Sequence, residues 1–220
     1  MLITVTGMHR EARLFPQGTE VVISGGENAG LARRIEQAIA KGARAIISVG
    51  IGGGLKPGLS VGSIVIAHEV VAEGARYHAD AEWADAVSAR IPQAVCGTIA
   101  GVDAIVTEPH DKAALHAKTG ALAADMETHI AASMAAAYEL PFAALRAVSD
   151  AAEDRLPPAV IGAIDNEGHL RLGAVLGSVA RNPLQIPALI RTGRNSDVAT
   201  KSLLRCFNLL GVGLGCPYLG

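Results

Sequence analysis

Short apolar runs rich in β-branched residues alternate along the chain with longer stretches whose apolar positions fall at helical spacing. The first pattern predicts strands and the second predicts helices. The expected strands cover Leu2–Thr6, Glu20–Ile23, Ala45–Val49, Ser63–Ala67, Val95–Ala100, Ala121–Ala124 and Phe142–Val148. The expected helices cover Glu27–Lys41, Ala79–Arg90, Pro109–Lys118, Glu127–Leu140 and Arg171–Ala180.

This alternation predicts an α/β fold with a mostly parallel sheet and helices on both faces. Such sheets bind ligands beyond the carboxyl ends of their strands. The length of 220 residues suits a single domain, which we expect to cover residues 1–220. Within it, residues 157–220 differ in character, because arginines and lysines are interspersed with Leu, Ile and Ala after a Pro157-Pro158 loop.

Composition narrows the class of protein. Half of the residues are hydrophobic and only 3% are aromatic, so a large core must be built from Ala, Val, Ile and Leu. A net charge of −2 gives no electrostatic reason to expect nucleic acid as a partner. No signal segment and no membrane-spanning run is visible, and the three cysteines and seven histidines have no metal-ligand spacing. These features favour a soluble cytoplasmic protein without a metal.

Two glycine clusters follow expected strands. The stretch from Ser24 to Asn28 is compatible with a tight turn or with an anion site at a helix start. The stretch from Gly50 to Leu55 contains four glycines, more than a turn requires, and we expect it to bring backbone close to a substrate.

A distinctive combination of motifs lies in the middle of the chain. Asp125-Met126-Glu127 opens an alanine-rich helix, and a strand then ends in Arg146-Ala147-Val148-Ser149-Asp150. This combination resembles the purine nucleoside phosphorylase and methylthioadenosine/S-adenosylhomocysteine nucleosidase superfamily. The resemblance covers residues 1 to about 154 and includes Gly7-Met8, Gly50 to Leu55, Val61 to Val65 and Gly101-Val102-Asp103. It implies three layers around a central, twisted, mixed, partly closed and mostly parallel sheet, and assembly into a homodimer or a larger homo-oligomer.

The resemblance also implies roles for individual residues. Asp150 would give its proton to purine N7, and Glu127 would accept a hydrogen bond from the ribose 2′-hydroxyl. Glu11 would activate water. The other expected substrate contacts are Met126 against the sugar, Ser149 beside Asp150, Ile51 and Gly52 in the glycine cluster, and backbone groups of Ile105 and Val106 at the purine edge.

Elementary chemistry agrees with these roles. A purine leaving C1′ takes electrons into its rings, so an acid beside it must stay protonated until that charge develops, which requires a raised pKa. A carboxylate on the 2′-hydroxyl binds more strongly as positive charge grows on the sugar. The alternative reading is structural, because Ser-Asp after a strand often caps a helix and the helix dipole favours Glu at a helix start. Arg146 is expected to neutralise a carboxylate inside the fold.

The chain departs from the superfamily pattern at the anion site. Ile51 stands where phosphorylases and nucleosidases carry a serine, and Ser48 stands where hexameric bacterial phosphorylases carry an arginine. Ile105 replaces a phenylalanine that stacks on adenine. These changes leave hydrolysis and phosphorolysis both open, although they weaken the case for a phosphate site.

The C-terminal part is similar to the hopanoid-biosynthesis-associated nucleoside phosphorylase-like proteins. The resemblance rests on Asp165-x-x-Gly168, Arg171-Leu172-Gly173 and the segment from Pro183 to Arg205. It implies adenine release from adenosylhopane, a lipid nucleoside, without a cofactor. The basic and apolar segment 183–207 then suits either a membrane interface at the inner membrane or packing on a partner subunit. A housekeeping nucleosidase or phosphorylase, and a non-catalytic nucleoside-binding relative, are the alternatives.

Overall fold

The computed structural model describes residues 1–220 except 16–18, 25–27, 162, 164–170 and 220. Two sequence motifs therefore lie wholly or partly outside the described residues. These are the first glycine cluster, of which Gly25, Gly26 and Glu27 are not described, and the stretch from Asp165 to Gly168.

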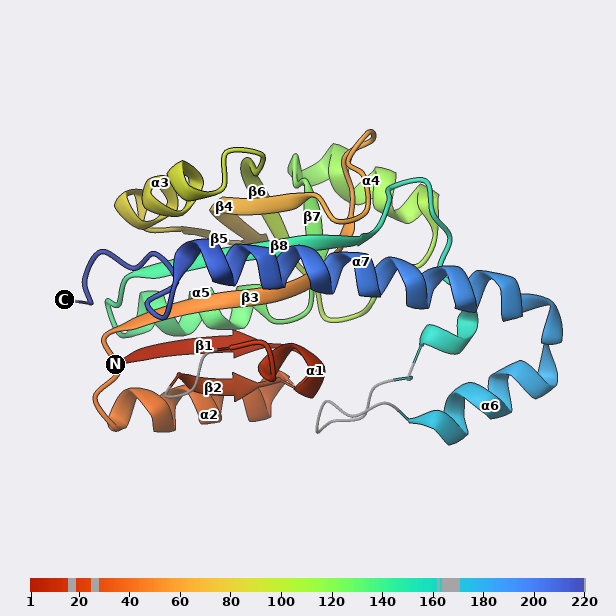
Figure 1. The fold of residues 1–220 in the computed structure, drawn as a ribbon, viewed down its shortest axis with the longest axis horizontal. Coiled ribbons are helices and arrows are strands. Elements are labelled where there is room, and N and C mark those ends of the chain that lie inside the picture. Colours follow the sequence, from red (N-terminus) through yellow and green to blue (C-terminus); the bar gives the residue numbers. More distant parts are fainter. Residues whose placement is uncertain (16–18, 25–27, 162, 164–170, 220) are drawn as a thin grey trace.

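Eight strands form one mixed sheet (Figure 1). They are β1 (Leu2–Thr6), β2 (Glu20–Ile23), β3 (Ala45–Gly54), β4 (Ile64–Ala72), β5 (Ala75–His78), β6 (Val95–Gly101), β7 (Ala123–Asp125) and β8 (Phe142–Asp150). Five of the strand pairs are parallel and three are antiparallel. The expectation of a mixed, mostly parallel sheet is therefore confirmed.

The sheet closes on itself at its centre. Its order is β2-β1-β3-β7-β6-β4-β5, and β8 pairs with both β3 and β4. The strands β3, β7, β6, β4 and β8 thus form a complete ring, which β1 with β2 and β5 extend outward. Closure removes open sheet edges from the ring and fixes the strand ends that carry the candidate site.

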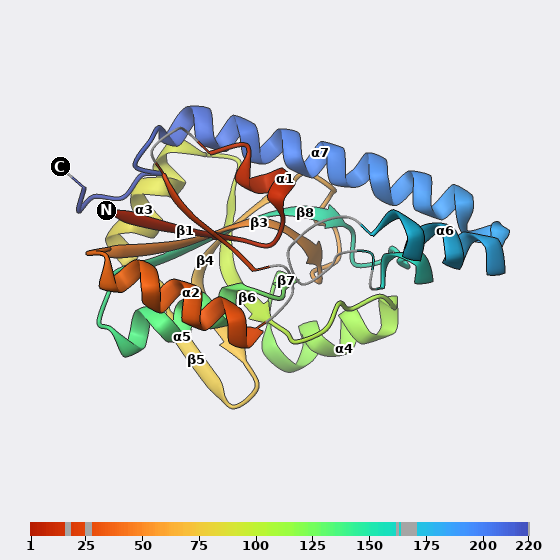
Figure 2. The same cartoon turned by 90° about the horizontal axis from the view of Figure 1, so that it is seen from below.

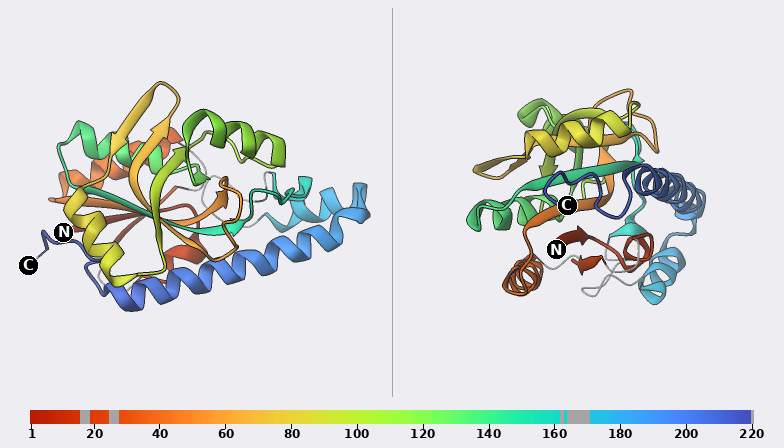
Figure 3. Two further views of the ribbon diagram at one scale, coloured as in Figure 1. Left: turned by 90° about the horizontal axis from the view of Figure 1, so that it is seen from above. Right: turned by 60° about the vertical axis from the view of Figure 1, so that its left-hand side comes forward.

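Helices cover the sheet on both sides (Figures 1 and 3). They are α1 (His9–Ala12), α2 (Asn28–Ala40), α3 (Ala81–Arg90), α4 (Pro109–Thr119), α5 (Thr128–Ala137), α6 (Leu172–Arg181) and α7 (Ile186–Leu210), with short 3₁₀ turns η1 (Pro158–Val160) and η2 (Pro183–Gln185). The three-layer α/β architecture predicted from the sequence is confirmed.

Two apolar clusters flank the sheet. One packs α2 and α5 against it around Ile35, Ile99 and Ile130. The other packs α3 and α7 against the opposite face around Trp83 and Leu203. Aliphatic residues and alanine supply most of both clusters, as the low aromatic content predicts, and Trp83 is fully buried with its Nε1 donating to Leu214 O at 3.0 Å.

Several strands differ from the sequence prediction. β3 does not stop at Val49 but continues through the glycine cluster to Gly54, because β8 pairs with it as far as Gly53 and β7 pairs with Gly53 and Gly54. β4 runs on to Ala72, beyond its predicted end at Ala67. β8 likewise runs on to Asp150. Residues 75–78 form β5, an unpredicted strand that follows Gly74 (φ 73°) and pairs with the extended end of β4. Pairing between segments distant in the sequence extends β3 and β8, and no local pattern records it, whereas β5 forms a hairpin with the neighbouring β4.

The C-terminal helices form an arm. α7 lies along β8 and β3 over its second half, while its first half extends past the carboxyl ends of those strands together with α6 (Figures 1 and 2). Gln185 ties the arm together, because its amide accepts from Ala159 N at 3.0 Å and donates to Ser178 Oγ at 3.1 Å. No helix among the described residues is long and apolar enough to cross a membrane.

Candidate active site

The glycine run at the end of β3 makes room for buried carboxyl groups. A Cβ on Gly50 would lie 2.9 Å from Glu11 Oε1, and a Cβ on Gly53 would lie 3.2 Å from Asp150 Oδ2. We expected these glycines to open backbone to a substrate. Two acids occupy the space beside Gly50 and Gly53, which are about 10 Å apart along an extended strand, and the substrate contact stays a prediction.

Glu11 lies in α1, shortly after the end of β1, and both of its carboxyl oxygens are hydrogen-bonded. Its Oε2 accepts hydrogen bonds from Thr6 Oγ1 (2.7 Å), Gly7 N (3.1 Å) and Met8 N (3.0 Å). Its Oε1 accepts from Ile51 N at 2.8 Å, so the side chain bridges the short helix α1 and the strand β3. Oε1 has one hydrogen bond and therefore retains a lone pair that can accept from a ligand.

Glu127 lies next to Glu11 at the start of α5. A Cβ on Gly7 would come within 3.0 Å of Glu127 Oε1, so this glycine too accommodates an acid. Burial raises the pKa of Glu127 to about 8, and the charges of Asp125 and Glu11 add to that effect while Arg146 opposes it. The side chain therefore holds a proton near neutral pH unless a ligand that donates a hydrogen bond favours the anion.

Arg146 and Asp125 form the floor beneath these acids. The Arg146 side chain is buried, its Nε lies 2.7 Å from Asp125 Oδ2, and its Nη2 donates to Ser48 Oγ at 2.7 Å. Asp125 Oδ1 also accepts from the backbone N–H groups of Glu127 (2.8 Å) and Thr128 (2.7 Å), which caps α5. The expected structural role of Arg146 is borne out by this ion pair, and Ser48 serves the same buried network.

A β-bulge sets the position of Asp150. Gly52 pairs with Val148 and Gly53 pairs with Asp150, so Ser149 is an extra residue in β8. Bulges of this kind re-aim a neighbouring side chain. The Ser149 hydroxyl lies 2.8 Å from Asp150 Oδ1 and 3.1 Å from Gly52 O, and the Asp150 residue is only 5% exposed.

Lys112 is the partner of Asp150. This lysine of α4 is completely buried, and its Nζ donates to Asp150 Oδ2, to Ala151 O (2.8 Å) and to Asp154 O (2.9 Å). Burial raises the pKa of Asp150, and Lys112 is the main influence that opposes the rise. Net elevation is what a general acid requires.

The remaining predicted site residues make fewer contacts with the three carboxyl groups. Met126 is half-buried beside Glu127 in sequence, while Ile105 is 39% exposed and Val106 half-buried in the loop between β6 and α4. Within the described chain neither Ile105 nor Val106 has a hydrogen bond to the carboxyl groups. The Ile51 side chain packs against the apolar cluster under α7, so only its backbone N–H reaches the site.

Two surface hollows lie away from these carboxyl groups. One, of about 390 Å³, is lined by β2 and α2 and includes His9 and Arg34. The other, of about 460 Å³, lies between β5 and α5 and includes Tyr77 and Phe142. Neither includes Glu11, Glu127 or Asp150, so we base the candidate site on the buried acids and not on hollow size.

Sequence reasoning did not find Lys112. It occupies an ordinary helix pattern, forty residues from its partners along the chain, and only the tertiary structure brings it to Asp150. Thr6, which donates to Glu11, was likewise taken only as a strand residue.

Solved nucleosidase structures share this fold. A methylthioadenosine nucleosidase mutant of Helicobacter pylori, with 5′-methylthioadenosine in its active site, is similar with a TM-score of 0.63 at 14% identity, covering 94% of this chain and 97% of that one. A putative methylthioadenosine/S-adenosylhomocysteine nucleosidase of Borrelia burgdorferi, bound to adenine, gives 0.64 at 16% identity, with coverages of 95% and 100%. A futalosine hydrolase mutant of H. pylori gives 0.58 at 15% identity, with coverages of 67% and 89%.

The sequence itself matches the Phosphorylase superfamily over residues 4–181. No curated protein matches the chain. The match spans most of the chain, and the chain therefore belongs to the Phosphorylase superfamily. At this level, the expectation of an enzyme of the nucleosidase or nucleoside phosphorylase kind is confirmed.

Proposed function

We propose that this protein hydrolyses the N-glycosidic bond of a purine nucleoside. The observation that carries the proposal is a set of three carboxyl groups, of which Glu11 and Asp150 are buried and Glu127 is half-buried, beside Gly7 just after β1 and beside Gly50 and Gly53 of β3. Carboxyl groups withdrawn from water are costly to a fold, so chemistry explains these three acids better than stability does.

Asp150 is the proposed general acid. Burial raises its pKa, which favours the protonated form that a general acid needs, and in the proposed step it gives that proton to N7 as the C1′–N9 bond breaks. The electrons of that bond pass into the purine rings. Protonation of the base converts a poor leaving group into a neutral one.

Glu127 and Glu11 act on the sugar and on water. The resemblance to the superfamily assigns the ribose 2′-hydroxyl to Glu127, and the hydroxyl hydrogen bond favours its ionised form despite the pKa of about 8. Glu11 then takes a proton from the attacking water through the lone pair left on Oε1.

The choice of hydrolysis over phosphorolysis rests on the cations. A phosphate site needs donors that are not already committed. Among the described residues, both cations beside the acids are engaged by protein: Arg146 with Asp125 and Ser48, and Lys112 with Asp150 and two carbonyl oxygens. Ile51 adds only a backbone N–H, which Glu11 already takes.

The first experiment is release of free base from a panel of nucleosides, quantified by chromatography with and without phosphate. Adenosine, inosine, methylthioadenosine and an adenosine with a long alkyl group at C5′ form the panel. Release without phosphate supports the proposal. Release that depends on phosphate replaces hydrolysis with phosphorolysis, and no release from any nucleoside rejects glycosidic cleavage.

For the natural substrate we propose adenosylhopane, as the C-terminal sequence resemblance implies. Adenine itself fits the superfamily, since the B. burgdorferi relative is bound to adenine. The lipid part finds support in the arm, whose large side chains are exposed: Leu184 at 90%, Leu176 at 66% and Leu172 at 63%. Preference for the alkylated adenosine over methylthioadenosine is the expected result, and the reverse preference favours a housekeeping nucleosidase.

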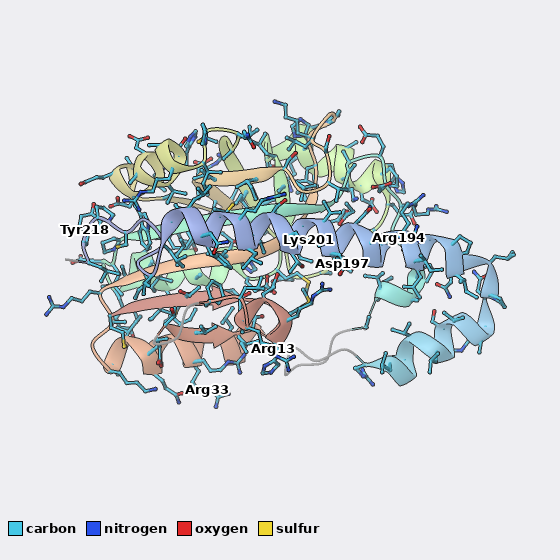
Figure 4. All side chains as sticks on the ribbon, viewed as in Figure 1. Arg13, Arg33, Arg194, Asp197, Lys201 and Tyr218 are labelled. Carbon is cyan, nitrogen blue, oxygen red and sulfur yellow. The ribbon has the colours of Figure 1, made fainter. Side chains whose placement is uncertain are left out.

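The arm also has the charge of a membrane-binding surface. Residues 171–196 include four arginines and no acidic residue, and all four are exposed. Arg194 lies near the middle of α7, and Asp197, the first acid after it, is paired with Arg10 at 2.5 Å (Figure 4). Exposed leucines with flanking arginines suit an anionic lipid surface. The arm extends beyond the carboxyl ends of β3 and β8, which is where Asp150 lies (Figure 2).

Sedimentation with vesicles tests this surface. Vesicles of phosphatidylglycerol and phosphatidylcholine should carry down the protein, and Leu184→Glu should weaken that binding about tenfold, equivalent to ~1.4 kcal/mol of lost apolar burial. Leu209→Glu is the matched control, because Leu209 is 57% exposed at the far end of α7. We also expect a homodimer or larger homo-oligomer. If Leu184→Glu instead dissociates it and vesicles bind neither form, the arm is a subunit interface.

A further inference from the structure

We propose that Lys112 is a positioning residue for the general acid, stabilising the carboxylate that Asp150 becomes when it protonates the leaving base. The inference rests on the proposed function, which makes Asp150 the acid. It adds a residue on α4 that no motif marks and whose side chain reaches the site only through the fold.

The hydrogen bonds of Lys112 indicate that its side chain is a protonated ammonium group. Its Nζ makes three hydrogen bonds, to Asp150 Oδ2, Ala151 O and Asp154 O. Both carbonyl oxygens can only accept, so at least two N–H groups are committed to backbone. With Asp150 Oδ2 as the third acceptor, the arrangement uses all three hydrogens of an ammonium group.

The segment after β8 is built to hold this ammonium. Asp154 Oδ2 accepts from Ala151 N at 3.0 Å, which closes a turn around the lysine head. Leu156 N donates to Thr107 O at 3.0 Å and anchors the same segment to the chain just before α4. Lys112 Nζ is therefore held by Asp150 and by two carbonyl oxygens of the anchored segment after β8. We infer that the ammonium group is already in place when negative charge develops on Asp150.

The reaction creates a need for such a cation. Before the reaction Asp150 is a protonated carboxyl group, which suits a residue that is 5% exposed. When the proton passes to the purine, a carboxylate is left in a dry site, and an unpaired buried charge is costly. A fixed ammonium beside it stabilises the developing anion without reorganisation.

The proton balance closes with the groups already present. Asp150 loses one proton to the base, Glu11 gains one from water, and the hydroxide oxygen bonds to C1′ as the C1′–N9 electrons leave with the base. Lys112 keeps its three protons throughout, so it acts only through Asp150. The other charged group facing Asp150 is Asp154, whose charge raises the Asp150 pKa and opposes the lysine.

The test compares Lys112→Met with Lys118→Met, an exposed lysine on the same helix. The wild type is first shown to release base from its best nucleoside. Lys112→Met should then lower kcat about 100-fold with little change in KM, because one preorganised contact to developing charge is lost. The alkaline limb of the kcat profile should move up by roughly one to three pH units, because the nearby cation no longer favours the carboxylate. Lys118→Met should match the wild type in both respects.

A double-mutant cycle separates this role from a structural one. In an Asp150→Asn background, Lys112→Met should cause no further loss of rate, because its effect passes through the Asp150 carboxylate. An unchanged alkaline limb in an active, folded Lys112→Met protein overturns the inference while leaving the proposed function standing. Failure of the wild type to release base from any nucleoside overturns the proposed function itself.

If Lys112→Met does not fold, Lys112→Gln removes the charge but keeps a polar N–H donor, and it is read in the same way. If neither variant folds, the test is an NMR titration of the wild-type protein labelled with ¹³C in aspartate and ¹⁵N in lysine. The Lys112 ¹⁵Nζ signal should shift as the Asp150 carboxyl titrates, and Asp150→Asn should remove that shift. Independent titration of the two signals overturns the inference.

Discussion

The candidate site contains two acidic centres that are stabilised in opposite ways. At one, Glu11 and Glu127 lie close enough for the charge of Glu11 to raise the Glu127 pKa, and Arg146 beneath them is committed to Asp125. At the other, Asp150 has a fully buried ammonium, Lys112, as a direct partner.

The difference shows how neighbouring charges give different roles to carboxyl groups of the same kind. Burial raises the pKa of both Glu127 and Asp150. Without a free cation, Glu127 retains its proton until a hydrogen-bond donor such as a hydroxyl arrives. With Lys112 in place, Asp150 can release its proton in the dry site. One centre is thus suited to sensing the sugar and the other to donating a proton.

The largest effect should follow removal of the acid. Asp150→Asn cannot donate a carboxyl proton and should lower kcat at least about 1000-fold, roughly 4 kcal/mol of transition-state stabilisation. Base release per enzyme in single-turnover assays measures it, with the exposed Asp85→Asn as control. Turnover near the wild-type rate in a folded Asp150→Asn protein would remove Asp150 from the mechanism and with it the contrast between the centres.

Loss of the sugar contact should be the next largest effect. Glu127→Gln should reduce kcat/KM by about 2 to 4 kcal/mol, because a neutral amide responds less to positive charge on the ribose. The sharper measurement compares a nucleoside with its 2′-deoxy form. The wild type should prefer the ribonucleoside and Glu127→Gln should lose most of that preference. An undiminished preference would mean that Glu127 does not contact the 2′-hydroxyl.

Glycine replacements can perturb each centre separately. Gly50→Ala brings a methyl group to 2.9 Å from Oε1 of Glu11, whose carboxyl group four hydrogen bonds hold in place, whereas Gly53→Ala brings one to 3.2 Å from Asp150 Oδ2. We expect about a tenfold loss of kcat for Gly50→Ala and about a threefold loss for Gly53→Ala, from strain of order 1 kcal/mol. Gly213→Ala, with nothing within 4 Å of the added Cβ, is the control. A larger loss of kcat for Gly53→Ala than for Gly50→Ala would show that Asp150 is held more rigidly than Glu11.

The last effect concerns stability, and its dependence on pH, in place of activity. The folded-state pKa of Glu127 is about 8 against an ordinary value of 4.5, so its favourable contribution is complete below about pH 4.5 and is lost as pH rises toward 8. Glu127→Gln should therefore stabilise the protein more at pH 8.5 than at pH 4.5. Urea unfolding at both values measures this, with the exposed Glu153→Gln as control. A gain independent of pH would place the Glu127 pKa near its ordinary value.

The strands show what local pattern carries. β1 and β2 match their predicted bounds, because β-branched residues with period-2 alternation are a local property. β3 was predicted to stop at Val49, since glycine has low strand propensity. Pairing with β8 on one side and β7 at the tip carries it to Gly54, and the close approach of Glu11, Ala124 O and Asp150 requires glycine there.

The two halves of α7 illustrate the same limit. Ala199, Leu203, Cys206, Phe207 and Leu210 are buried at helical spacing, yet the turns before Ala199 contain no buried residue. Both halves carry a similar mixture of apolar and basic side chains. Only the position of the ring of strands decides which half is covered and which extends past it.

The sequence alone determined the α/β class, the order of most elements and the three acids that a superfamily resemblance singles out. These rest on periodicity and on short motifs, which are encoded by neighbouring residues. The tertiary structure alone decided ring closure, the bulge at Ser149, the pairing of Arg146 with Asp125 and the burial of Lys112 against Asp150. Each joins residues distant in sequence, and the free energy of such contacts depends on burial and on charges that only folding brings together.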